Sequence, residues 1–169
     1  MSGVNLKALG PMDAPEVLSL YRAAATGRGG LARHPDEIDL GYVQAFLTRA
    51  SAGGVSLGAY VGDVLAGEIH ATRIGPRQFA HVLTDLTVAV HPDYQGQGLG
   101  QALFKGLFAA AVSLSPPAER IELMAREGNG DAIRLYLRLG FVIEGRFPGR
   151  VRLEDGTVEA DIAMGRPLP

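Results

Sequence analysis

Residues 88–103, VAVHPDYQGQGLGQAL, carry three glycines at every second position, after a strand-like run and a proline. Glycine costs roughly 0.5–1 kcal/mol wherever regular secondary structure could have formed. Gly96, Gly98 and Gly100 therefore indicate a place where the backbone, rather than a side chain, must come close to something.

The flanks of these glycines are those of a phosphate-binding loop. A strand is expected to end at Val90, and a helix is expected to open near Gly98. Consecutive N–H groups without bulky side chains form an anion nest, and a helix N-terminus adds about +0.5 of an elementary charge. A glycine-rich turn without a ligand is the simpler alternative.

Two common phosphate loops do not match this stretch. A nucleoside-triphosphate loop needs G-x-x-x-x-G-K-[ST], and neither the Lys nor the Ser/Thr is present. A dinucleotide loop needs G-x-G-x-x-G directly after its strand. Here Gln101 stands where the third glycine belongs, and five residues separate Val90 from Gly96.

The composition is that of an ordinary globular protein, which we expect to form one domain over residues 1–169. Hydrophobic residues make up 47% and charged residues 20%, and the formal net charge of −2 gives no basic field for nucleic acid. The sequence has no cysteine, and its 4 histidines show no metal-ligand spacing. We therefore expect neither a metal nor a nucleic-acid partner.

Two observations bear on the compartment. The N-terminal stretch MSGVNLKALGPMD lacks the basic segment and the apolar core of a secretory signal. No apolar run in the sequence approaches the ~18–20 residues that span a bilayer. We therefore expect a cytoplasmic protein with no membrane partner.

Hydrophobic periodicity and turn residues predict the element order β-α-α-β-β-β-α-β-α-β-β. The expected helices cover residues 12–25, 36–50, 98–112 and 130–139, with stops at Gly27–Gly30 and Gly140 and an N-cap at Asn129. The expected strands cover residues 4–9, 55–61, 64–74, 81–90, 120–125, 142–146 and 151–164, with a hairpin signal at Asp155-Gly156. An antiparallel meander that runs into βαβα units predicts an α/β protein with a mixed sheet covered by helices.

Alternation assigns faces within two of these strands. In the strand over residues 64–74, one face is expected to hold Leu65, Ile69 and Ala71, and the polar face Glu68, His70 and Thr72. In the strand over residues 81–90, one face is expected to hold Val82, Leu86, Val88 and Val90.

Two motifs identify a family resemblance. The stretch Q-x-x-G-x-G (Gln95, Gly98 and Gly100) after V-x-V-x-P resembles the acyl-CoA pyrophosphate loop of the GNAT N-acetyltransferase superfamily. Residues 129–141, NGDAIRLYLRLGF, are similar to the N-x-x-A-x-x-L-Y-x-x-x-G-F motif of the same family. The resemblance covers residues 88–141, and the flanking element order agrees with it.

The resemblance implies the GNAT fold, a largely antiparallel mixed sheet flanked by helices on both faces. It implies transfer of an acetyl group from acetyl-CoA to a primary amine by direct attack in a ternary complex. A small molecule or an amino acid is the favoured acceptor, and a protein N-terminus or lysine is the other. The implied reaction needs no metal.

The resemblance also implies which residues hold acetyl-CoA. Backbone N–H groups of the glycine loop would bind the pyrophosphate, and the edge at residues 88–90 would pair with the pantetheine arm and hold the thioester oxygen. The implied set is Val88, Ala89, Val90, Gln95, Gly96, Gln97, Gly98, Leu99, Gly100, Gln101, Asn129 and Tyr136.

Tyr136 would protonate the departing CoA thiolate. By spacing alone, however, Tyr136 lies on an apolar helical stripe with Ala132 and Leu139, which is also the pattern of a core tyrosine. Asn129 can likewise be an N-cap and nothing more.

The acceptor amine must lose a proton before it attacks, and the base stays open. The candidates are Glu68 and His70 on the polar strand face, and His81 and Asp85 on the neighbouring strand. Some family members use a strand glutamate whose position is Thr84 here, so that role does not carry over, and the spacing of Glu122 does not fit the family's other base position.

Acceptor and assembly are less well determined by the sequence. Arg146, Arg150 and Arg152 are expected in a loop that could grip a carboxylate, or on a solvated hairpin face. Exposed strand edges and a very apolar helix are compatible with a homodimer. The alternative functions are a non-catalytic acyl-CoA sensor and a nicotinamide or flavin enzyme.

Overall fold

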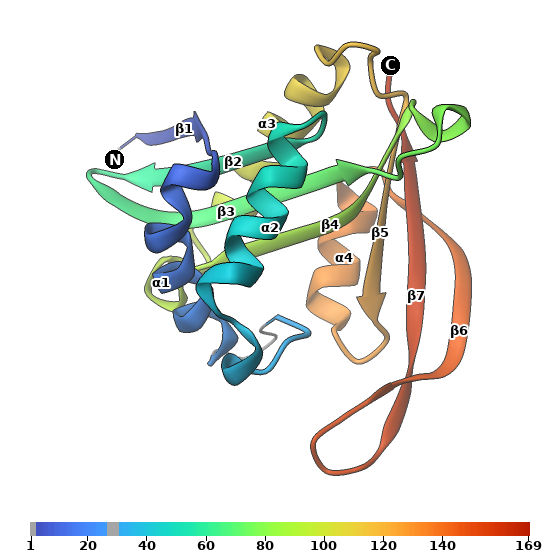
Figure 1. Ribbon diagram of the computed structural model, residues 1–169. Coiled ribbons are helices and arrows are strands. Elements are labelled where there is room, and N and C mark those ends of the chain that lie inside the picture. The colour runs from blue at the N-terminus through green and yellow to red at the C-terminus, as the bar shows by residue number, and fades with distance from the viewer. Residues whose placement is uncertain (1–2, 27–30) are drawn as a thin grey trace.

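The computed structural model describes residues 3–26 and 31–169. The chain forms a seven-stranded sheet in the order β1-β2-β3-β4-β5-β7-β6 (Figure 1). The strands are β1 (Val4–Ala8), β2 (Val55–Val61), β3 (Val64–Arg73), β4 (Val82–Val90), β5 (Arg120–Arg126), β6 (Val142–Arg152) and β7 (Val158–Pro167). Neighbouring strands are antiparallel except β4 and β5, which are parallel. The predicted mixed, largely antiparallel sheet is confirmed.

Helices lie on both faces of this sheet (Figure 1). They are α1 (Ala14–Ala25), α2 (Leu40–Ser51), α3 (Leu99–Val112) and α4 (Gly130–Arg138), in the predicted order. α2 begins later than predicted, because Asp39 caps it by accepting a hydrogen bond from the Tyr42 N–H, and Pro35–Glu37 forms a separate 3-10 turn. The predicted stop at Gly27–Gly30 lies outside the described residues.

The core consists of two apolar clusters on opposite faces of the sheet. One lies under α1 and α2 and includes Val17, Phe46 and Leu65. The other lies under α3 and α4 and includes Leu103 and Phe141. In the described part of the chain, no helix is long and apolar enough to cross a membrane.

An extra residue in β3 changes which face Leu65 occupies. Ala59 pairs with Gly67 and Tyr60 pairs with Leu65, so Ala66 is the unpaired residue of a β-bulge. Leu65 joins the cluster under α1 and α2, whereas Ala66 and Ile69 join the opposite cluster. The prediction that Leu65 shares a face with Ile69 is wrong, because the bulge reverses the alternation.

A second bulge lies in β4. His70 pairs with Thr87 but Thr72 pairs with Thr84, which leaves one extra residue in β4 at Asp85, a non-glycine residue with φ of 53°. Leu83, rather than the predicted Val82, belongs to the cluster against which the later β4 side chains pack, namely Leu86, Val88 and Val90. The extra residue is again the reason for the wrong prediction.

β4 and β5 are neighbours over a very short length. Val82 pairs with Arg120 and Leu83 pairs with Ile121, and these two pairs make up the ladder between them. Figure 1 shows the strands running apart from this junction. Among the described residues, the rest of β4 therefore has a free backbone edge in the middle of the sheet.

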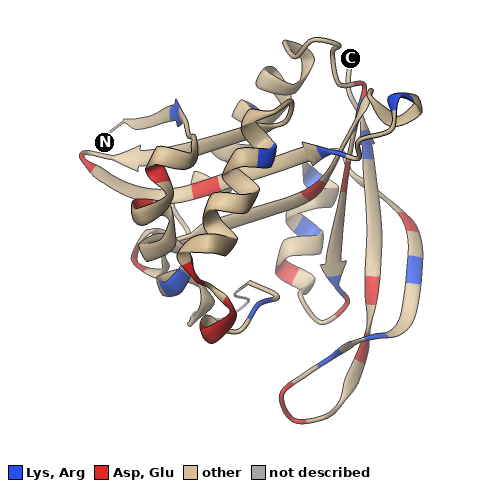
Figure 2. Cartoon of the chain, in the orientation of Figure 1, with Lys and Arg blue, Asp and Glu red and all other residues tan. Residues whose placement is uncertain are grey.

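β6 and β7 differ from the predicted strands in their bounds. β6 continues to Arg152 through a bulge between Phe147 and Val151, and β7 begins at Val158. The hairpin at Asp155-Gly156 is confirmed, with Gly156 at a φ of 85°. Arg146, Arg150 and Arg152 therefore lie within a strand, not in the predicted loop. Charges of both signs occur along this hairpin (Figure 2).

Candidate active site

Gly96 and Gly98 form a left-handed turn at the start of α3. Their φ angles are 72° and 80°, values that residues with a Cβ atom rarely adopt. A Cβ at either position would meet nothing within 4 Å, so conformation, not crowding, requires glycine here. Gly98 is the N-cap of α3.

The first turn of α3 faces this glycine loop. Leu99, Gly100 and Gln101 occupy that turn, and the first N–H groups of a helix have no intrahelical partner. Gly100 differs from the other two glycines, because a Cβ there would make only an ordinary contact with Leu135 at 3.8 Å.

The residues before the turn are held locally. The Gln95 N–H donates to the Pro92 carbonyl (3.3 Å), and the Gln97 side chain donates to the Asp93 carbonyl (3.3 Å). These contacts fix a compact turn between β4 and α3, which presents backbone N–H groups at the helix start.

Val88, Ala89 and Val90 lie on β4 beyond its bulge. They pair with β3 on one side, and on the other side they face the widening gap toward β5. A free strand edge next to a helix N-terminus is the arrangement expected from the sequence for an extended, amide-bearing ligand with a phosphate group.

Asn129 and Tyr136 belong to α4, which packs beside the start of α3. The Asn129 side chain accepts a hydrogen bond from the Ala132 N–H (3.4 Å), so it caps the helix as predicted. The Tyr136 ring is 9% exposed and contacts Phe104 and Phe141 edge-on, with ring centroids 5.5 and 6.0 Å away. Burial raises the pKa of Tyr136 to about 12, so its hydroxyl keeps the proton at neutral pH.

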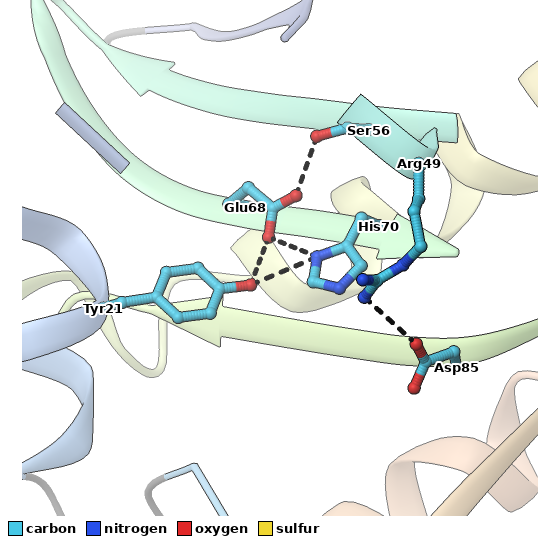
Figure 3. A network of polar contacts seen from close by, with 6 residues as sticks. All are labelled: Tyr21, Arg49, Ser56, Glu68, His70 and Asp85. Atoms are coloured by element: carbon cyan, nitrogen blue, oxygen red, sulfur yellow. Dashed lines mark hydrogen bonds and ion pairs between the residues drawn. The ribbon is translucent and has the colours of Figure 1, made fainter. Parts of the chain in front are cut away.

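The polar face of β3 carries a buried hydrogen-bond network beneath α1 and α2 (Figure 3). The Tyr21 hydroxyl donates to Glu68 Oε2 (2.5 Å), and the Ser56 hydroxyl donates to Glu68 Oε1 (2.8 Å). His70 Nδ1 lies 3.2 Å from Glu68 Oε2 and 3.3 Å from the Tyr21 hydroxyl. Burial and the Glu68 carboxylate raise the pKa of Tyr21 well above its ordinary value.

Asp85 lies at the β4 bulge and pairs with Arg49 of α2, at 3.5 Å from guanidinium nitrogen to carboxylate oxygen. Both side chains are more than half exposed. An exposed pair of this kind contributes little to stability. The positive φ of Asp85 nevertheless fixes where its carboxylate emerges from the strand.

Two adjoining pockets open on the α1–α2 side of the sheet. The smaller, of about 150 Å³, is lined by residues that include Tyr42, Phe46, Arg49, His70, Asp85 and Thr87. The larger, of about 430 Å³, is lined by residues that include Arg33, His34, Arg126, Arg152, Glu154 and Asp155. The two share residues 31–33, and the smaller pocket reaches the β4 bulge.

The structure separates the predicted arginine cluster. Arg146 pairs with Glu127 (2.6 Å), and Arg150 lies 3.4 Å from Asp161. Of the three predicted arginines, Arg152 is the one that lines the larger pocket.

The structure does not bring the candidate base His81 to the site, nor Glu122, whose spacing already excluded it. His81 is exposed just before β4, and Glu122 pairs with Arg120 (2.8 Å). Neither is among the described residues that line the two pockets.

Sequence reasoning missed the side chains that surround Glu68. Tyr21 and Ser56 come from α1 and β2, and Tyr21 is 47 residues away from Glu68 along the chain. No local motif marks such a contact. The one available signal was the Glu-x-His alternation of residues 68–70, which places both side chains on one face.

Comparison with known families and structures agrees with this geometry. A family model for the acetyltransferase (GNAT) family matches residues 15–141. No curated protein matches the chain in sequence.

Solved structures share the fold at low identity. The acetyltransferase of the GNAT family from Streptococcus pneumoniae has a TM-score of 0.87 and 22% identity, over 98% of this chain and 100% of its own. The ribosomal-protein-S18-alanine N-acetyltransferase from Escherichia coli has a TM-score of 0.79 and 22% identity, over 98% of this chain and 94% of its own. A phosphinothricin acetyltransferase from Sinorhizobium meliloti, in complex with AcCoA, has a TM-score of 0.79 and 18% identity, over 99% of this chain and 89% of its own.

Proposed function

Because the chain belongs to the GNAT family of acetyltransferases, we propose that it moves the acetyl group of acetyl-CoA to a primary amine. The observation that carries the proposal is the left-handed turn at Gly96 and Gly98, placed at the N-terminus of α3 beside the free edge of β4. The amine attacks the thioester directly, within a ternary complex.

The described residues fit acetyl-CoA. Gln95, Gln97 and the N–H groups of Gly96–Gln101 would hold the pyrophosphate without a metal, since the helix N-terminus supplies positive charge. Val88–Val90 would pair with the amides of the pantetheine arm as an added strand. A backbone N–H near Val90 would donate to the thioester oxygen as negative charge develops there. Asn129, at the start of α4, would close the same site.

Tyr136 would give its proton to the departing thiolate. Its pKa of about 12 keeps it protonated at neutral pH, as a general acid requires. Its packing between Phe104 and Phe141 would hold the ring in one place.

The acceptor is proposed to be a small amine that carries a carboxylate, such as an amino acid. Three arginines line the pocket of about 430 Å³, namely Arg33, Arg126 and Arg152. A guanidinium group binds a carboxylate through paired hydrogen bonds, and the volume lies in the range of small-molecule sites. One solved neighbour is named for a ribosomal protein and another for phosphinothricin, so the fold leaves the acceptor open.

Thermal unfolding with and without acetyl-CoA tests the cosubstrate. At 100 times its Kd, a ligand stabilises the folded state by about 2.7 kcal/mol, or roughly 5–10 °C for a domain of this size. Gly98→Ala should lose most of this shift. Gly62→Ala is the matched control, because Gly62 has a φ of 61° and open space but lies in the β2–β3 hairpin. No shift with the wild type would contradict the proposal.

An amine panel with detection of free thiol then tests the reaction. Each amino acid is paired with the same amine lacking its carboxylate, and we expect the amino acid to react at least tenfold faster. Arg152→Gln should remove that preference. Binding of acetyl-CoA without turnover on any amine would favour a non-catalytic acyl-CoA sensor instead.

The proposal extends to a homodimer through the free edge of β6. This strand ends the sheet and exposes Val142, Ile143 and Phe147, each more than two-fifths exposed. Light scattering after size exclusion tests this: we expect a dimer for the wild type and a monomer for Ile143→Lys, and a monomeric wild type would contradict the proposal.

A further inference from the structure

We propose that His70 is the general base of this acetyltransferase and that Glu68 is its positioning residue. The inference rests on the proposed acetyl transfer and adds the group that removes the proton from the acceptor. It chooses among the base candidates of the sequence, and it assigns a role to the buried network beneath α1 and α2.

His70 lines the smaller of the two pockets, through which the acceptor amine is proposed to reach the thioester. It is on β3, paired with Thr87 of β4 just beyond the bulge at Asp85, and its side chain lines the pocket of about 150 Å³. That pocket adjoins the larger arginine-lined pocket and reaches the free section of β4, where the thioester is proposed to bind.

The hydrogen bonds around His70 determine its tautomer. Tyr21 commits its only proton to Glu68, so both neighbours of Nδ1, the Glu68 Oε2 and the Tyr21 oxygen, are acceptors. Nδ1 must therefore carry a hydrogen. In the neutral imidazole this leaves the lone pair on Nε2, the nitrogen on the ring edge away from Glu68 (Figure 3).

Packing holds the ring in this orientation. The Phe46 ring stacks on the His70 imidazole with centroids 4.0 Å apart and an angle of 11° between the planes. Glu68 is held in turn by Tyr21 and Ser56. A base whose second nitrogen is fixed by a buried carboxylate is oriented for proton transfer, and the carboxylate stabilises the imidazolium that forms.

The other candidates lack one requirement each. Glu68 is fully buried, and both its oxygens already accept hydrogen bonds, so it contacts His70 and not the pocket. The Asp85 side chain is 65% exposed and pairs with Arg49, so its carboxylate is solvated and already bound to a cation.

The proton balance is complete with these groups. The acceptor arrives as an ammonium ion and gives one proton to Nε2 of His70, which becomes an imidazolium ion. The free amine forms the C–N bond to the thioester carbon, and the C–S bond breaks. The thiolate takes a proton from Tyr136, which regains one from the new amide nitrogen, and His70 releases its proton to solvent.

Several charged or titratable groups will shape the pH dependence of this step. β3 contributes Glu68, α1 contributes Tyr21, and α2 contributes Tyr42 and Arg49. β4 contributes Asp85, and Arg33 stacks on the Tyr42 ring at 4.1 Å. The dependence of kcat/KM on pH will therefore reflect this whole group of residues, and variants are needed to separate their contributions.

The kinetic test compares His70→Gln with Asp85→Asn on the best amine of the panel. We expect His70→Gln to lower kcat/KM at pH 7 by roughly 100-fold or more, within the usual range for general base catalysis. Its deficit should shrink as the pH rises toward the pKa of the amine, because the amine then loses its proton to water. Asp85→Asn should lower kcat/KM far less than His70→Gln does, so the two variants rank the two candidate bases. His81→Asn replaces an exposed histidine outside the pockets and is the matched control.

A second measurement does not depend on turnover. Nitrogen-15 NMR of histidine-labelled wild-type protein should show the neutral His70 with hydrogen on Nδ1 and none on Nε2. Glu68→Gln should favour the opposite tautomer, since an amide can donate to Nδ1, and should lower kcat/KM while the shift with acetyl-CoA persists.

The outcomes separate this inference from the function on which it rests. If the wild type neither binds acetyl-CoA nor acetylates any amine, the proposed function fails. If it is active and folded His70→Gln has the wild-type rate and pH profile, or if the neutral ring carries its hydrogen on Nε2, the assignment of His70 is overturned.

Discussion

At the scale of single residues, Glu68 shows most directly what this fold must satisfy. A fully buried carboxylate is costly unless hydrogen bonds replace its hydration. Its donors come from α1, β2 and β3, so the packing of these three elements is coupled through one side chain. The residue therefore links stability of the sheet to the geometry of the proposed base.

Removal of one donor should show this coupling. Tyr21→Phe deletes the hydroxyl that donates to Glu68, and we expect a loss of about 1–3 kcal/mol in the free energy of unfolding. Tyr60→Phe is the matched control, because its hydroxyl donates to Glu16, which stays accessible to water. Urea denaturation measures both variants, and equal losses would contradict the special cost of burying Glu68.

Tyr136 makes a kinetic prediction at the same scale. Tyr136→Phe keeps the ring between Phe104 and Phe141 but removes the acid, so kcat should fall by about 10- to 100-fold while the Kd of acetyl-CoA stays the same. A thiolate leaves readily, which keeps the effect small. Because the pKa of Tyr136 is raised to about 12, its loss of a proton should not lower the wild-type rate between pH 7 and 9. A large increase in the Kd of acetyl-CoA for Tyr136→Phe would show instead that Tyr136 has a structural role.

At the scale of elements, the bulges in β3 and β4 mark where sequence reasoning stopped. Element order, the glycine loop and both helix caps of α4 followed from periodicity, glycine positions and Asn129. The sheet faces of Leu65 and Val82 were not predictable in this way. One extra residue in a strand moves the side chains beyond it to the opposite face, and no residue type marks where it occurs. Aspartate is compatible with the left-handed conformation that Asp85 adopts, but its presence in the sequence does not predict that conformation.

For the candidate site, too, the sequence predicted what local motifs contain and not what depends on how the helices pack. The loop residues and Tyr136 lie on local motifs, and the structure places them on neighbouring helices. Burial of the Glu68–His70 face depends on where α1 and α2 dock, which alternation within one strand cannot contain. For this reason the sequence identified a polar face but did not predict that helices cover it.

α3 allows one substitution to be tested in two environments. A Cβ at Gly100 would lie 3.8 Å from Leu135, whereas a Cβ at Gly106 would lie 2.7 Å from Leu6 and 3.0 Å from Leu57. Gly100→Ala should raise the free energy of unfolding by roughly 0.5–1 kcal/mol through helix propensity, and keep acetyl-CoA binding. Gly106→Ala should gain less stability than Gly100→Ala, because its Cβ must displace the ends of the Leu6 and Leu57 side chains. Chemical denaturation of both variants measures the difference, and an equal gain for both would contradict the argument.

At the scale of the whole molecule, apolar packing joins two halves that share little backbone pairing. Two residue pairs link β4 to β5, yet one core cluster contains Ile69 and Leu83 from one side and Ile121 and Ile162 from the other. α3 lies across both groups through Leu103 and its neighbours. The halves are thus coupled by side chains.

We therefore expect the chain to unfold as a single cooperative unit. The calorimetric and van't Hoff enthalpies of thermal unfolding should agree, and no separate transition of residues 120–169 should appear. The single domain proposed for residues 1–169 predicts the same. A van't Hoff enthalpy well below the calorimetric one would contradict it.

The short ladder between β4 and β5 also affects how readily the protein aggregates. A central strand whose outer amides lack a neighbour can recruit a strand from another molecule, as sheet borders do in amyloid. Cosubstrate bound along Val88–Val90 would cap that seam. Purified protein warmed without acetyl-CoA should become turbid at a lower temperature than protein saturated with acetyl-CoA. The difference should exceed the shift in unfolding temperature that acetyl-CoA causes.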